Sequence, residues 1–227
     1  MSRQFNVAIV GASGAVGEEI LKTFDKRNFP LKSLRLLASS RSAGRQLSFR
    51  DEVLTIEELT PESFSGIDIA MFCASGGISR EYAKYAVDAG AIVVDNSSVF
   101  RMQDDVPLIV PEVNAAAVSG HKGIIANPNC TTTIMLVALK PLYELSRIKR
   151  IIVSTYQSAS GAGAKGMQEL EEQTAQYLKG EEIKPHFFQH QYAFNLFSHN
   201  TDIDESGYNT EELKMVYETR KILGDEE

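Results

Sequence analysis

A lone cysteine in the middle of the chain has the clearest chemical potential of any residue. Cys130 follows the turn signal Asn127-Pro128-Asn129 and precedes an apolar run, 134–139. This order predicts a thiol at or near the N-terminus of a helix. Unpaired backbone N–H groups and the positive end of the helix dipole stabilise a thiolate there. The alternative is a packed cysteine, because free cysteine is often buried, but the setting favours a nucleophile.

The second cysteine, Cys73, ends an apolar run, 67–72, and is predicted to be a buried core residue. Two cysteines are too few for a disulfide framework, which favours a reduced compartment. The first residues show no signal-peptide pattern, and no apolar stretch approaches the roughly 20 residues that span a bilayer. We therefore expect a cytoplasmic protein that has no membrane partner.

A glycine-rich loop near the N-terminus predicts a dinucleotide site. Gly11-Ala12-Ser13-Gly14-Ala15-Val16-Gly17 has the pattern G-x-x-G-x-x-G. It lies between a strand-like run, 6–10, and apolar residues at helical spacing from Val16 to Phe24. Glycines permit a tight turn and let backbone N–H groups approach a diphosphate at a helix N-terminus. The alternative is a glycine-rich turn without a ligand, but the strand–loop–helix context favours binding.

The end of the second predicted strand favours NADP over NAD. NAD-specific folds usually place an acidic residue there for the ribose 2′-hydroxyl. This chain has Ser39-Ser40-Arg41-Ser42 instead. Hydroxyl groups and an arginine suit a 2′-phosphate, although a solvated polar loop would have the same composition.

The alternation of strand-like and helical patterns predicts an α/β fold with a Rossmann-type doubly wound sheet. A second domain follows it, where the strand–helix pattern restarts near Asn129. The predicted domains are 1–129, which binds the dinucleotide, and 130–227. Further strands are expected at 34–38, 67–74, 91–95 and 148–157, and further helices at 79–89, 131–145, 164–179 and 210–223, with Thr210 as the cap of the last.

Composition excludes some functions. The chain has 227 residues, of which 43% are hydrophobic, so a real core is expected. The net charge of -7 argues against a nucleic-acid partner. No metal site is expected.

A thiolate beside a dinucleotide suggests one specific chemistry. The thiolate adds to an aldehyde, and the resulting hemithioacetal gives a hydride to the nicotinamide, which leaves a thioester. If phosphate resolves the thioester, the product is an acyl phosphate, and an anion pocket must lie beside the thiol. Arg101 is a candidate for that pocket because arginine binds phosphate bidentately. The alternative is a surface arginine on a loop.

Five segments, in order, resemble those of the aspartate-semialdehyde dehydrogenase family. They are 11–17 (GASGAVG), 39–44 (SSRSAG), 94–101 (VDNSSVFR), 127–132 (NPNCTT) and 157–163 (QSASGAG). The resemblance covers essentially the whole chain. Phosphorylating reductases for glyceraldehyde 3-phosphate and N-acetylglutamyl phosphate share the chemistry but match these segments less well.

The resemblance implies roles for individual residues. Cys130 would form the acyl-thioester, and Gln157 would bind substrate and help to position the thiol. Arg101, with Asn96, would hold the phosphate. The implied NADP-binding residues are Gly11, Ser13, Gly14, Ala15, Val16, Arg41 and Ser42, with Ser160 and Gly161 on the nicotinamide side. Glu211 would contact the substrate amine, and Lys214 would contact the phosphate. Without the resemblance, their i, i+3 spacing indicates only a solvent-exposed pair on one face of a helix.

The family activity implied is the NADPH-dependent conversion of L-aspartyl 4-phosphate to L-aspartate 4-semialdehyde. The product feeds lysine synthesis, through diaminopimelate, and the synthesis of methionine, threonine and isoleucine. The resemblance also implies that 130–227 is an incomplete α+β catalytic and dimerisation domain, and that the protein forms a homodimer or homotetramer.

Family members continue well beyond Leu223 with an arginine for the substrate carboxylate and an acid/base histidine. None of the four histidines here lies in that context. General acid–base help is typically worth about 10²–10⁴-fold. Residues 1–227 alone are therefore expected to turn over more than about tenfold more slowly than a full-length homologue. The alternatives left open are a nucleotide-binding module without turnover and one of the related phosphorylating reductases.

Overall fold

A computed structural model describes residues 3–225 of the chain. The chain divides into two compact units, which are described separately. Unit 1 comprises 3–150 and 216–225, and unit 2 comprises 151–215. The predicted boundary at residue 129 concerns functional domains and stays a prediction.

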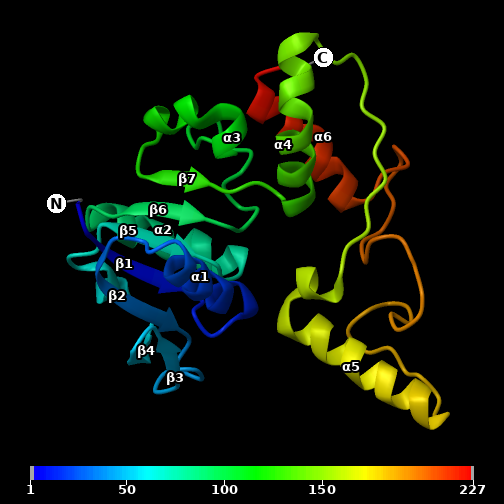
Figure 1. Cartoon of the computed structure of the whole chain (residues 1–227), viewed down its shortest axis with the longest axis horizontal. Helices are drawn as coiled ribbons and strands as arrows, with labels where there is room; N and C mark the ends of the chain where they lie inside the picture. The colour runs from blue at the N-terminus through cyan, green and yellow to red at the C-terminus, as the bar shows by residue number, and fades with distance from the viewer. Residues whose placement is uncertain (1–2, 226–227) are drawn as a thin grey trace. The chain divides into compact units, whose positions relative to one another are not determined.

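Unit 1 is built on a seven-stranded sheet (Figure 1). Its order is β3-β4-β2-β1-β5-β6-β7. Every neighbouring pair is parallel except β3 and β4. The strands are β1 (Phe5–Val10), β2 (Leu31–Ala38), β3 (Gln46–Phe49), β4 (Glu52–Glu58), β5 (Ile69–Phe72), β6 (Ile92–Asp95) and β7 (Ile124–Ala126). Because β1 pairs with β2 on one side and β5 on the other, the strand order reverses there. Ligands of such sheets bind at the carboxyl ends of the strands at that point.

The sheet is buried on both faces, which explains the continuous apolar runs in the sequence. Successive side chains of a strand point to opposite faces. Accordingly, Val7 and Ile9 of β1 belong to one buried cluster, and Ala8 and Val10 belong to another. The predicted doubly wound α/β fold is confirmed.

Helices contribute to both clusters. Leu21 and Phe24 of α1 (Ala15–Lys26) join the first cluster. Ala83 and Ala86 of α2 (Gly76–Asp88) join the second. The remaining helical elements of unit 1 are η1 (Pro61–Phe64), α3 (Pro111–Asn114), η2 (Ala115–Gly120) and α4 (Cys130–Leu145). Pro141 lies inside α4 without ending it.

Unit 2 contains η3 (Ala159–Ala162), α5 (Gly163–Lys179) and the first part of α6 (Thr210–Leu223), whose second part belongs to unit 1. The strand predicted at 148–157 is wrong, because these residues carry no regular secondary structure. A strand needs a partner for its ladder of hydrogen bonds, and no described strand pairs with this segment. The predicted cap of α6 is also wrong. Asn209 rather than Thr210 caps the helix, since the Glu212 N–H donates to Asn209 Oδ1 at 3.0 Å.

A buried carboxylate on α5 holds the loop that follows the helix. Glu169 is fully buried and accepts hydrogen bonds from the backbone N–H groups of His186, Phe187 and Phe188. One turn later, Gln173 Oε1 accepts from the backbone N–H groups of 192 and 193. Burial alone would raise the pKa of Glu169, but the three N–H donors outweigh it and the pKa is lowered.

We expect the Glu169 carboxylate to stabilise unit 2 in a pH-dependent way. Because its folded-state pKa is depressed, the contribution is fully present above the usual glutamate pKa of about 4.3 and is lost as pH falls through the lower folded value. The measurement is the difference in free energy of unfolding between the unchanged chain and Glu169→Gln, at about pH 6 and about pH 3. The difference should shrink at the lower pH, whereas Glu171→Gln, at an exposed position of the same helix, should show no such change. An equal difference at both pH values would contradict the role.

Candidate active site

The glycine loop joins β1 to α1 at the carboxyl end of the central strand. Gly11 has a positive φ of 88°, and a Cβ there would lie 3.0 Å from the backbone of Cys73 and Ala74. A Cβ on Gly17 would lie 2.7 Å from Gly11 O and from Ala12 Cα. Glycine is therefore required at both positions. Gly14 is the N-cap of α1 and has no side chain to cap the first N–H groups, which the N-terminus of a helix can offer to an anion.

The two segments predicted to hold NADP lie next to each other. Ser13 Oγ of the glycine loop donates to Ser42 Oγ at 3.2 Å. Ser42 belongs to a turn directly after β2, in which its N–H donates to Ser39 O at 2.8 Å. Arg41 in this turn is exposed. Hydroxyl groups and a guanidinium thus line the place where a dinucleotide on the glycine loop would carry its ribose.

Cys130 is the first residue of α4, and its side chain is exposed. Asn129 caps the helix, because its Oδ1 accepts from the N–H groups of Thr131 at 3.0 Å and Thr132 at 3.3 Å. The helix start predicted from the turn signal is confirmed. An exposed thiol at a capped helix N-terminus is a position suited to a nucleophile.

The other thiol is in the opposite environment. Cys73 packs beside the core of β1 and β2, and its Sγ donates to Val10 O at 3.0 Å. Burial raises the pKa of Cys73 to about 12. This thiol stays protonated at neutral pH and has a structural role.

Arg101 is buried rather than exposed on the surface, and it is paired. Its Nη1 lies 2.9 Å from Glu218 Oε1, and the two side chains are only 9% and 2% exposed. Its Nη2 donates to Asn96 O at 3.0 Å. Among the described residues, Arg101 Nε has no acceptor. The other oxygen of Glu218, Oε2, accepts from the N–H of Asn129 at 2.6 Å, so Arg101 is linked through one carboxylate to the residue before Cys130.

Unit 2 brings together three of the predicted substrate residues. Gln157 Nε2 donates to Glu211 Oε1 at 3.2 Å, and Lys214 Nζ lies 2.9 Å from Glu211 Oε2. Glu211 is buried, so Glu211 and Lys214 do not form the solvated pair on a helix surface that the residues alone suggested. Ser160 and Gly161 lie in η3, where Ser160 Oγ contacts Ser158 Oγ at 2.6 Å.

Sequence reasoning missed three residues of these clusters. Glu218 pairs with Arg101 across 117 positions, and no local pattern reveals such a partner. His199, one of the four histidines outside the family's acid/base context, has its Nε2 3.8 Å from Glu211 Oε2. The cap Asn129 did carry a signal, since asparagine is a favoured N-cap residue.

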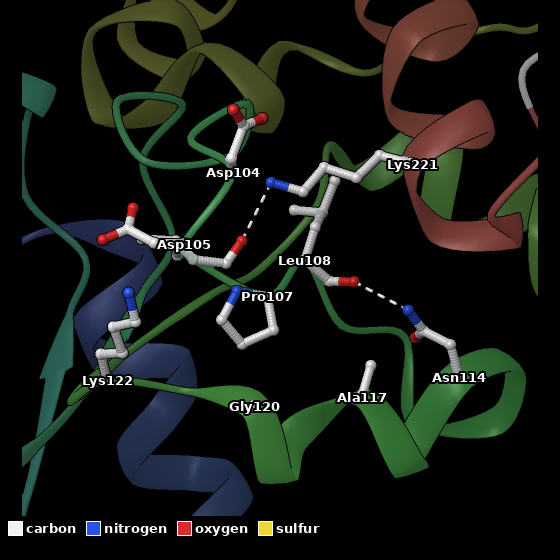
Figure 2. Close-up of a pocket in the computed structure, with 10 residues that line it drawn as sticks. Asp104, Asp105, Pro107, Leu108, Asn114, Ala117, Gly120, Lys122 and Lys221 are labelled. Atoms are coloured by element: carbon white, nitrogen blue, oxygen red, sulfur yellow. Dashed lines mark hydrogen bonds between the residues drawn. The ribbon is translucent and has the colours of Figure 1, made fainter.

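A pocket of about 510 Å³ opens elsewhere on unit 1 (Figure 2). It contains none of the predicted site residues, and it is lined by Asp104, Asp105, Val106, Pro107, Leu108, Asn114, Ala117, Gly120, Lys122 and Lys221. The Lys221 ammonium donates to the carbonyl oxygens of 101, 103 and 106, so its hydrogen bonds are made to the backbone and not to a ligand in the pocket.

Residues 3–225 lack two other kinds of feature, a membrane-spanning helix and a metal-binding cluster. None of the described helices has the length and apolarity that a membrane crossing requires. The same residues contain no cluster of three or more histidine, cysteine or acidic side chains able to hold a metal ion.

Two family models match the chain. The semialdehyde dehydrogenase NAD-binding domain matches residues 6–121, and the semialdehyde dehydrogenase dimerisation domain matches residues 139–227. An aspartate-semialdehyde dehydrogenase from Prochlorococcus marinus is 49% identical over 225 residues. That alignment covers 99% of this chain and 66% of the relative, so the chain spans about two thirds of the length of the curated relatives it matches.

Solved structures agree with the family models. The crystal structure of aspartate semialdehyde dehydrogenase II from Vibrio cholerae, complexed with ASA, has a TM-score of 0.96 and 46% identity, over 99% of this chain and 68% of that one. An aspartate semialdehyde dehydrogenase with NADP from Candida albicans has a TM-score of 0.57 and 28% identity, over 64% of this chain and 48% of that one. The chain belongs to the aspartate-semialdehyde dehydrogenase family.

Proposed function

We propose that this chain carries the cofactor site and the nucleophile of an enzyme that converts L-aspartyl 4-phosphate to L-aspartate 4-semialdehyde. One observation carries the proposal: an exposed thiol, Cys130, begins a capped helix in the same unit as a glycine loop shaped for a dinucleotide. The names of the relatives support the substrate, and the Vibrio cholerae structure was solved with ASA.

Cys130 acts as the nucleophile in the proposed reaction. Its thiolate attacks the acyl carbon, the C–S bond forms, and the C–O bond to phosphate breaks, which releases inorganic phosphate. NADPH, when bound, supplies the hydride that reduces the thioester carbon. The reduced carbon then re-forms its C=O bond as the C–S bond breaks, so the aldehyde leaves and Cys130 is again a thiolate.

The residues around the glycine loop fit NADP. Gly11, Ser13, Gly14, Ala15 and Val16 form the turn that would receive the diphosphate. Arg41 and Ser42 supply a charge and a hydroxyl for a 2′-phosphate, and the bond between Ser13 and Ser42 joins both groups. The Candida albicans relative, solved with NADP, supports the same choice. Ser160 and Gly161 would contact the nicotinamide side.

The remaining residues hold the substrate in this proposal. Arg101, with Asn96, receives the phosphate, because a buried guanidinium with a free Nε donor is prepared for an anion. Glu211 meets the substrate amine, Lys214 meets the phosphate, and Gln157 orients the acyl group. The hydrogen bond from Gln157 to Glu211 and the ion pair from Lys214 to Glu211 support a shared task.

The proposed activity would work in the cytoplasm as a homodimer or homotetramer. It would supply semialdehyde for lysine synthesis, through diaminopimelate, and for methionine, threonine and isoleucine. The dimerisation-domain match at 139–227 supports self-association.

The test is a stoichiometric reaction in the reverse direction, which does not require sustained turnover. The chain is mixed with aspartate semialdehyde and NADP without phosphate, and the absorbance of reduced nicotinamide is followed. We expect about one equivalent of NADPH per chain and an acyl adduct on Cys130 by mass spectrometry. Binding of NADP without any adduct would contradict the proposal and leave a nucleotide-binding module. Adduct formation with N-acetylglutamate semialdehyde or glyceraldehyde 3-phosphate, but not with aspartate semialdehyde, would favour a related reductase.

A further inference from the structure

The part of α6 in unit 1 lies beside α4 (Figure 1), and its side chains contact both the Arg101 segment and Asn129, the cap of α4. Glu218 and Lys221, three residues apart, lie on one face of α6, and Asp225 follows just beyond the last residue of the helix, Leu223. The Lys221 ammonium donates to the carbonyl oxygens of 101, 103 and 106. Asp225 accepts from Tyr143 Oη at 2.6 Å and from Arg147 Nη2 at 2.7 Å, beside the C-terminal end of α4. This face therefore holds both the Arg101 segment and α4.

Glu218 is the residue that joins these two segments directly. Its Oε1 pairs with Arg101 Nη1 at 2.9 Å, and its Oε2 accepts from the N–H of Asn129 at 2.6 Å. Asn129 in turn caps the first turn of α4 through the N–H groups of Thr131 and Thr132. One carboxylate thus fixes the spacing between a cationic side chain and the residue that precedes Cys130.

The charges of Arg101 and Glu218 balance each other. Glu218 is 2% exposed and Arg101 is 9% exposed, so water screens neither of them well. A lone carboxylate beside the backbone of Asn129 would repel an anionic partner approaching Cys130, and a lone guanidinium would attract one. The pair keeps the net charge near zero while Arg101 Nε, which has no acceptor among the described residues, still provides a donor.

We infer that Glu218 is a positioning residue for Cys130: it sets the charge around the thiol by balancing Arg101, and it tethers the start of α4 through Asn129. The pairing itself is a property of the structure, while its relevance to an anionic substrate rests on the proposed function. Glu218 needs no contact with the substrate for this role.

The charge part of the inference predicts opposite shifts in reagent preference. The measured quantity is the ratio of Cys130 alkylation rates by anionic iodoacetate and neutral iodoacetamide, read by mass spectrometry. Glu218→Gln leaves the Arg101 charge unbalanced and should raise the ratio by about three- to tenfold. Arg101→Met should lower it by a similar factor. Glu144→Gln removes a carboxylate from the exposed side of α4 and serves as the matched control, with a ratio that changes by less than about twofold.

The tether part is tested in the double variant Arg101→Met with Glu218→Met. Replacing both partners of a buried pair by apolar side chains often leaves a protein folded, so this variant covers the case in which a single variant fails to fold. Its reagent ratio should stay within about twofold of the unchanged chain. Hydrogen exchange of the amides in 129–132 should rise by about tenfold or more, because the Asn129 N–H has lost its acceptor, while exchange in α5 stays the same.

Three results would overturn the inference. The first is a folded Glu218→Gln chain whose reagent ratio is unchanged. The second is a pair of single variants whose ratios move in the same direction. The third is unchanged hydrogen exchange at 129–132 in the double variant. Any of these results would show that Glu218 does not position Cys130, and it would leave the proposed function intact as long as Cys130 in the unchanged chain still forms its adduct with aspartate semialdehyde. A missing adduct in the unchanged chain would instead count against the proposed function.

Discussion

Replacing Cys130 with serine is expected to abolish adduct formation and to lower hydride transfer from aspartate semialdehyde by about 10³-fold or more. The geometry at the start of α4 should survive, because the cap on Asn129 does not use the thiol. A serine hydroxyl at this position remains protonated near neutral pH and is a much weaker nucleophile than a thiolate. The measurement is the yield of NADPH per chain without phosphate, with NADP binding as the check on folding.

The matched control is Cys73→Ser, which removes the other thiol. Cys73 donates a hydrogen bond to Val10 O and packs beside the core of β1 and β2. A serine can make the same bond, so hydride transfer in this variant should remain within about twofold of the unchanged chain. Retention of activity in Cys130→Ser together with its loss in Cys73→Ser would reverse the assignment of the nucleophile.

Replacing Glu218 with alanine is expected to lower the free energy of unfolding by about 3–5 kcal/mol. Removal of this carboxylate leaves the buried guanidinium of Arg101 without its counter-charge and the N–H of Asn129 without an acceptor. Both groups are buried, so water cannot replace the lost partner without cost. The measurement is denaturant unfolding of the whole chain, followed at α4 by hydrogen exchange.

Two comparisons make this stability prediction specific. Glu144→Ala removes an exposed carboxylate that faces Lys140, and it should change stability by less than about 1 kcal/mol. The double variant Arg101→Met with Glu218→Met should recover most of the loss, because no unpaired charge remains. If Glu218→Ala lowers the free energy of unfolding by less than about 1 kcal/mol, the carboxylate does not hold Arg101 and Asn129 together.

The central strands and their helices could be predicted from the sequence because a parallel sheet buried on both faces leaves continuous apolar runs. The apolar run 6–10 and the glycines after it predicted a buried strand followed by a turn, and the structure has β1 at Phe5–Val10. The hairpin of β3 and β4 left no such run. Most of its exposed positions carry polar residues, although Val53 is also exposed. Arg50 makes the turn with a positive φ of 52°, where glycine would have been the signal.

The strand predicted at 148–157 is absent because no neighbouring strand pairs with it among the described residues. The β-branched residues at 151–153 and 155 favoured a strand, yet β propensity describes a fit to a pleated surface and needs a neighbouring strand. The predicted cap of α6 was wrong for a local reason. Both Asn209 and Thr210 are favoured caps, and only the reciprocal bonds between Asn209 and Glu212 decide between them.

The sequence predicted only those features of the candidate site that depend on residues close together in the chain. The place of Cys130 follows from a turn, a cap and an apolar helix within about a dozen residues. The partner of Arg101 does not, because Glu218 lies in a polar helix and no spacing rule connects residues 117 positions apart. Such pairs are set by how the elements pack.

The most direct test of the account is competitive alkylation of the two thiols in the native chain at neutral pH, with each site quantified by mass spectrometry. Burial raises the pKa of Cys73 to about 12, which lowers its thiolate fraction by about 10³-fold relative to an ordinary cysteine. Cys130 is exposed at the start of α4. The account predicts that Cys130 is modified at least about 100-fold faster than Cys73, and that the difference disappears on unfolding. Equal rates in the native chain, or faster modification of Cys73, would contradict it.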